Sequence, residues 1–120
     1  AKELGKSVFV HIKTQKGKGM PEAESSPEKY HLVVNNGAKD DTFHSVFADS
    51  LIDLAKENSD VVAVTAAMGI GTGLKEFNNK FSDRFFDVGI AEGHAVTFSA
   101  GLSKEGLLPF CNIYSLTNLS

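Results

Sequence analysis

The sequence predicts an α/β fold, a partial parallel sheet with flanking helices. From residue 43 onward, segments whose apolar residues have helical spacing alternate with short apolar runs typical of strands. Glycine-containing loops follow two of these runs, at residues 69–73 and at residue 89. Because strand and helix alternate, we expect parallel strands joined by right-handed crossovers.

The first helix of this series has the clearest pattern. Phe43, Val46 and Phe47 begin an apolar stripe that continues at spacings of three and four residues. Asp41 or Thr42 can act as its N-cap. The expected elements are helices 43–57, 74–81 and 92–104 and strands 61–65, 84–88 and 107–113.

Two of the expected strands carry further information. Val61–Thr65 is an unbroken apolar run, typical of a strand covered on both faces. Pro109 lies in the last expected strand, and because proline cannot donate a main-chain hydrogen bond it favours a late start or an edge position. A sheet of three strands leaves apolar edges uncovered, so we do not expect this chain to be a complete functional unit.

The first 42 residues have a different character. Residues 7–13 are β-branched and apolar and predict a strand, and a basic glycine turn follows at residues 15–19. Residues 20–42 contain two prolines and little periodicity, which indicates a linker or an extended functional loop. Lys16-Gly-Lys18-Gly19 could bind phosphate through glycine N–H groups and a lysine, although an exposed basic turn is the more common explanation of such a segment.

Composition excludes several classes of function. The 120 residues have a net charge of −3, which offers no general attraction to nucleic acid, although residues 1–20 hold five lysines and one glutamate. The single cysteine, Cys111, excludes an internal disulfide framework and a CxxC zinc site. No stretch is apolar and long enough to span a bilayer, so we expect a cytoplasmic protein without a membrane partner. The chain begins with alanine, and we expect it to be an internal piece of a longer protein.

The three strand ends should meet at one edge of the sheet, where ligands of such folds bind. The corresponding loops are residues 65–73, 88–94 and 112–115. The first loop does not match the GxGxxG dinucleotide motif. Glu92 starts a helix, where the macrodipole favours its charge in any case. His94 lies about 200° around the same helix, so we expect it to pack against its neighbours or to support a site residue rather than to be a ligand itself.

These segments, in this order, resemble the 1-deoxy-D-xylulose-5-phosphate synthase family, thiamine-diphosphate enzymes of the transketolase type. The resemblance rests on residues 11–19, on Pro21-Glu-Ala-Glu24 with Tyr30-His31, on residues 83–98 and on Pro109 with Ile113-Tyr-Ser115. It implies that residues 1–30 end the first, diphosphate-binding domain and that residues 31–42 form a linker. Residues 43–120 would be the N-terminal half of the pyrimidine-binding domain.

The resemblance implies a decarboxylating condensation of pyruvate with D-glyceraldehyde 3-phosphate, the first step of the non-mevalonate isoprenoid pathway. Glu92 matches the family's catalytic glutamate, which hydrogen-bonds N1′ of the cofactor's aminopyrimidine. A carboxylate in a dry pocket can share a proton with that nitrogen. The cofactor itself performs the carbanion chemistry, and the protein orients it.

The resemblance assigns roles to five more residues. Ile90 matches an apolar contact to the pyrimidine, and Met68 lies in a loop expected near the bent cofactor. Lys16 matches a lysine near the cofactor diphosphate. His31 matches an active-site histidine beside the substrate, and Tyr114 matches a tyrosine near the substrate phosphate.

The resemblance also implies Mg²⁺ with ligands outside this chain, a homodimer, and partnership with the remainder of a parent chain. Gly93 stands where most relatives have glutamine, and the likeness ends after Ser115. We therefore expect the chain alone to lack activity. Two alternatives stay open: another thiamine-diphosphate enzyme, such as transketolase or a 2-oxo-acid dehydrogenase β subunit, and a non-catalytic interaction module.

Overall fold

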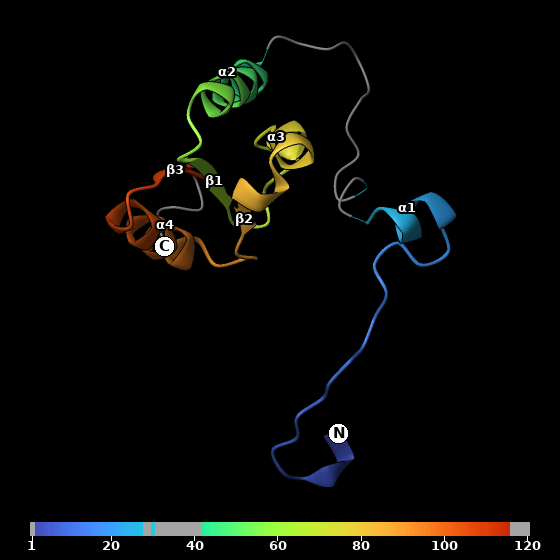
Figure 1. Ribbon diagram of the computed structural model, residues 1–120. Coiled ribbons are helices and arrows are strands. Elements are labelled where there is room, and N and C mark those ends of the chain that lie inside the picture. Colours follow the sequence, from blue (N-terminus) through green and yellow to red (C-terminus); the bar gives the residue numbers. More distant parts are fainter. Residues whose placement is uncertain (1, 28–29, 31–41, 116–120) are drawn as a thin grey trace. The chain divides into compact units, whose positions relative to one another are not determined.

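The alternation predicted for the second part of the chain is confirmed by the computed structural model, which describes residues 2–27, 30 and 42–115. The chain divides into two compact units, Ala1–Asn36 and Gly37–Ser120. The second unit contains a three-stranded parallel sheet and is of the predicted α/β class (Figure 1).

The sheet is built around its central strand. β1 (Val61–Thr65) pairs in parallel with β2 (Phe85–Asp87) on one side and with β3 (Leu108–Asn112) on the other, giving the order β2-β1-β3. Every residue of β1 is buried, as its unbroken apolar run predicts. β3 is an edge strand, which agrees with the position of Pro109.

Helices cover both faces of this sheet (Figure 1). α2 (Phe43–Glu57) and α3 (Lys75–Lys80) pack on one face, and α4 (Glu92–Lys104) packs on the other. Side chains of β1 alternate between the two resulting cores, because successive residues of a strand point to opposite faces. The first core contains Leu51, Ile52, Ala55, Val61, Ala63, Leu74 and Phe77. The second contains Val64, Ala66 and Ala95, with Phe86 and Phe98 packed against them.

The predicted bounds agree closely with the observed ones. α2, β1 and α4 match to the residue, and α3, β2 and β3 are each shorter by one residue at both ends than the predicted segments. Thr42, rather than Asp41, is the N-cap of α2. A one-residue difference is the usual fraying of element ends.

Arg84 joins the turn before β2 to the end of α2. This residue ends the short 3₁₀ helix η2 (Ser82–Arg84), and its Nη1 donates to the carbonyl oxygens of Ala55, Asn58 and Ser59 at 3.0, 3.2 and 3.3 Å. Its guanidinium also lies 4.1 Å from the centre of the Phe81 ring. A cation at a helix C-terminus satisfies carbonyl groups that the helix leaves unpaired.

The first unit corrects two predictions. Within its described residues, the regular structure is the 3₁₀ helix η1 (Lys2–Leu4) and α1 (Pro21–Ser25), and α1 lies inside a segment predicted to be a linker or an extended loop. Residues 7–13 are not a strand: Phe9 is 94% exposed and Ile12 is 75% exposed. A strand needs a neighbour for its main-chain groups, and residues 2–27 provide none. The β-branched pattern of residues 7–13 is therefore not sufficient by itself to predict a strand.

No helix within the described residues has the length and apolarity needed to cross a membrane.

Replacing Arg84 should destabilise the second unit. Arg84→Ala removes a charged donor shared by three carbonyl groups, so we expect the free energy of unfolding to fall by about 1.5–3 kcal/mol. Urea denaturation followed by circular dichroism measures this loss. Lys80→Ala, on the exposed surface of α3, is the matched control and should change little. An unchanged midpoint for Arg84→Ala would contradict the assigned role.

Candidate functional site

The carboxyl ends of the three strands meet at one edge of the sheet, as predicted. The register places Thr65 beside both Asp87 and Asn112, the last residues of the two neighbouring strands. Thr65 is fully buried, and its hydroxyl donates to the carbonyl oxygen of Asn112 at 2.9 Å. The loops that leave this edge are residues 66–74, 88–91 and 113–115. They therefore start side by side, at the aligned ends of hydrogen-bonded strands.

The loop after β1 contacts the loop after β3. The main-chain N–H of Tyr114 donates to the sulfur of Met68 at 3.3 Å. The Tyr114 hydroxyl lies against Gly71, where a Cβ atom would overlap it. Two predicted site residues, Met68 and Tyr114, are thus in direct contact, and glycine is required at position 71 for this close approach.

The loop after β1 is also joined to the loop after β2. Oδ1 of Asp87 accepts hydrogen bonds from the main-chain N–H groups of Ala67 and Gly89, at 2.8 and 2.9 Å. Ala67 has a φ of +59°, which non-glycine residues rarely adopt. Asp87 is not among the site residues predicted from the sequence. A carboxylate at the end of a strand and two residues before a glycine is a signal for such a turn.

Glu92 and Ile90 belong to this same edge. Glu92 is the first residue of α4 and is half-buried. Ile90 lies two residues before it, in the loop after β2, and its side chain is 87% exposed. His94 is exposed, and its ring lies 6.0 Å from the ring of Phe98.

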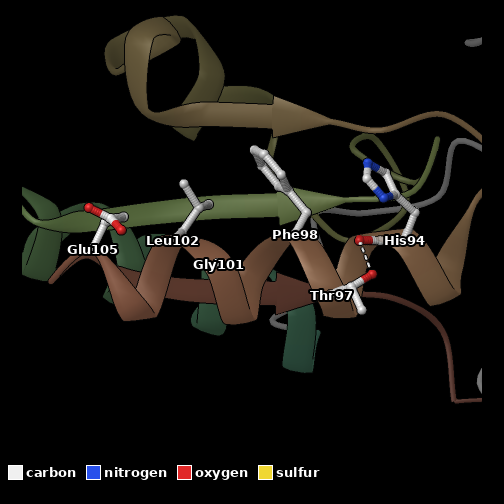
Figure 2. Close-up of a pocket in the computed structure, with 6 residues that line it drawn as sticks. All are labelled: His94, Thr97, Phe98, Gly101, Leu102 and Glu105. Atoms are coloured by element: carbon white, nitrogen blue, oxygen red, sulfur yellow. Dashed lines mark hydrogen bonds between the residues drawn. The ribbon is translucent and has the colours of Figure 1, made fainter.

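A separate hollow runs along α4 (Figure 2). Its volume is about 490 Å³, and it is lined by His94, Thr97, Phe98, Gly101, Leu102 and Glu105. Figure 2 shows that the side chains of His94, Phe98 and Leu102 project from the same side of the helix. None of the predicted site residues lines it, so we do not assign it to the candidate site.

The basic glycine turn of the first unit is held by Glu24. One carboxylate oxygen of Glu24 accepts from the N–H of Gly19 at 2.8 Å, and the other accepts from the Gln15 side-chain amide at 3.1 Å. Gly17 has a φ of +78° and packs against Ala23, where a side chain would overlap the backbone.

This arrangement corrects the phosphate interpretation of the turn. The N–H groups of Lys18, Gly19 and Met20 already donate to Gln15, Glu24 and Gly17 respectively. They are therefore not available as a backbone cradle for an anion. A phosphate bound at this turn would need other donors, such as the lysine side chains.

The predicted site residues fall into three groups. Met68, Ile90, Glu92 and Tyr114 share the carboxyl edge of the sheet in the second unit. Lys16 belongs to the first unit. His31 lies outside the described residues.

Comparison with known proteins agrees with this architecture. The family model described as transketolase, pyrimidine binding domain, matches residues 41–116. The chain is 48% identical to the 1-deoxy-D-xylulose-5-phosphate synthase of Clostridium beijerinckii and 50% identical to that of Clostridium perfringens. Each match covers 96% of this chain but 20% of the relative, so the chain spans about a fifth of the length of these curated relatives.

Adding a side chain at Gly71 should displace Tyr114. In Gly71→Ala the new methyl group occupies the position of the tyrosine hydroxyl, and we expect a loss of about 1–3 kcal/mol of stability from overpacking. The chain has two tyrosines and no tryptophan, so near-ultraviolet circular dichroism reports on Tyr114 once Tyr30→Phe has removed the other signal. Gly93→Ala, which adds its Cβ in open space, is the control. Identical spectra for Gly71→Ala and wild type would contradict the contact.

Removing the Glu24 carboxylate should loosen the basic turn. Glu24→Ala deletes both hydrogen bonds, and we expect the Gly19 amide to lose about 1 kcal/mol of protection against hydrogen exchange. Glu22→Ala changes a neighbouring exposed carboxylate on the same helix and serves as the control. Equal exchange rates in the two variants would show that Glu24 does not hold the turn.

Proposed function

Because this chain belongs to the transketolase pyrimidine-binding domain family, we propose that it is part of a 1-deoxy-D-xylulose-5-phosphate synthase. In this proposal the whole enzyme condenses pyruvate, with decarboxylation, and D-glyceraldehyde 3-phosphate. The observation that carries the proposal is the 48–50% identity, over nearly all of this chain, to relatives that bear that name. The same identity favours this enzyme over transketolase or a 2-oxo-acid dehydrogenase β subunit.

The proposal assigns the chain to two domains of the parent enzyme. Residues 1–30 end the diphosphate-binding domain, residues 31–42 form the linker, and residues 43–120 begin the pyrimidine-binding domain. Activity then requires the rest of the parent chain, which also supplies the Mg²⁺ ligands. The parent enzyme acts as a homodimer in the cytoplasm.

The carboxyl edge of the sheet fits the aminopyrimidine end of thiamine diphosphate. An aromatic ring with ring nitrogens needs an apolar surface to cover it and a polar group at its rim. Ile90 offers an exposed apolar side chain, and the half-buried Glu92 carboxylate follows two residues later. Met68, held against Tyr114, adds a polarisable thioether from the neighbouring loop.

Glu92 is the catalytic residue of this proposal. When bound, thiamine diphosphate supplies the carbanion chemistry of the reaction. The Glu92 carboxylate holds a proton shared with N1′ of the aminopyrimidine, which a neutral amide at the same position could not do. Ile90 packs on the ring and excludes water from that hydrogen bond.

The remaining site residues act on phosphate groups and on the substrate. Lys16 provides its ammonium group to the cofactor diphosphate, from a turn whose shape Glu24 maintains. Tyr114 binds the substrate phosphate from the loop after β3. His31 acts beside the substrate.

Replacing Glu92 in the full-length enzyme tests the proposal. Glu92→Gln keeps the shape of the side chain but cannot share the proton, so we expect product formation from pyruvate and glyceraldehyde 3-phosphate to fall about 10²–10⁴-fold. Glu105→Gln, just beyond the other end of the same helix, is the control and should retain activity. A wild-type parent enzyme that forms no 1-deoxyxylulose 5-phosphate would refute the function. Full activity of Glu92→Gln would refute the role of Glu92.

A further inference from the structure

We propose that Asp87 is a positioning residue that sets the spacing of the two loops around the aminopyrimidine site. The inference rests on the proposed function and adds a residue to which neither the family resemblance nor the comparisons assign a role. Asp87 touches neither the cofactor nor the substrate in this proposal. It acts through Met68 on one loop and through Ile90 on the other.

The two hydrogen bonds of Asp87 carry the argument. Its Oδ1 accepts from the N–H of Ala67, the residue before Met68, at 2.8 Å, and from the N–H of Gly89, the residue before Ile90, at 2.9 Å. One oxygen atom thus joins two loops at the positions next to their predicted site residues. Hydrogen bonds to an ionised carboxylate are shorter and stronger than neutral ones.

This link begins where the sheet ends. The main-chain pairing of β1 with β2 finishes as the N–H of Val88 donates to the carbonyl oxygen of Thr65 at 3.0 Å. Beyond that point, within the described residues, no main-chain hydrogen bond of the sheet joins the loop after β1 to the loop after β2. The Asp87 side chain joins them instead. The loops therefore keep a defined spacing although they are no longer part of the sheet.

The conformation of Ala67 indicates that the link does more than complete a turn. With a φ of +59°, Ala67 adopts a backbone region that L-residues with a Cβ rarely adopt. Strained conformations persist where surrounding contacts hold them, and they are concentrated at functional sites. The hydrogen bond from Ala67 to Asp87 is such a contact, and it directs the chain into the Met68 loop.

Two variants of the full-length enzyme test the inference. Asp87→Ala removes the acceptor, so peptides covering residues 66–74 and 88–91 should exchange hydrogen faster, and the Kd for thiamine diphosphate should rise about tenfold. Asp87→Asn keeps an oxygen acceptor without the charge, and its Kd should rise about threefold. Because Glu92 stays intact, kcat at saturating cofactor should recover in both variants. Asp83→Asn, in the turn before β2, is the matched control and should match wild type.

Each result has a definite meaning. Unchanged exchange in Asp87→Ala overturns the link between the loops, and faster exchange with an unchanged Kd overturns its effect on the site. If Asp87→Ala does not fold, Asp87→Asn provides the test. A Kd for thiamine diphosphate and a loop hydrogen exchange in Asp87→Asn that both equal those of wild type overturn the inference. A wild-type enzyme that binds no thiamine diphosphate refutes the proposed function and this inference with it. Cofactor binding that is normal in wild type and unaltered in both variants refutes only the inference.

Discussion

Burial of β1 on both faces is the constraint on which the second unit depends. All five residues of this strand are buried, so helices must cover both sides of the sheet. Parallel neighbours on both edges of β1 require crossover connections, and α3 and α4 provide them. The carboxyl ends of the three strands then fall on one line. The position of the candidate site is thus a consequence of how the core is covered.

At the carboxyl edge of the sheet the main-chain hydrogen bonds between strands end. Beyond this edge, hydrogen bonds that involve side chains connect the loops. Thr65 bonds to the carbonyl oxygen of Asn112, Asp87 bonds to two loop amides, and Met68 accepts from the N–H of Tyr114. Buried or crowded main-chain groups need partners, and here the partners belong to neighbouring loops. The hydrogen bonds that give the loop N–H groups their acceptors therefore also determine where Met68, Ile90 and Tyr114 lie.

The sequence was sufficient for elements whose signal is local. The apolar stripe of α2 and the short β-branched run of β1 predicted both elements to the residue, because helical spacing indicates the helix and a short apolar run rich in valine indicates the strand. The local pattern predicted a strand wrongly for residues 7–13, because a strand also requires a neighbouring strand, which the local pattern does not reveal. The contact of Asp87 with Ala67 and that of Gly71 with Tyr114 join residues distant in sequence, so no local spacing predicts them. Composition and periodicity located Glu92 at a strand-to-helix junction, but only the family resemblance connected it with a reaction.

The proposed cofactor contacts come from both units of the chain. Lys16 would bind the diphosphate from the first unit, and Glu92 would bind the aminopyrimidine from the second. Each group is prepared within its own unit: Glu24 shapes the turn beside Lys16, and Asp87 joins the loops around Ile90. Binding energy spent on ordering flexible groups is lost from affinity. Because the hydrogen bonds of Glu24 order the turn and those of Asp87 order the loops before any ligand binds, less binding energy is lost on ordering either set of groups.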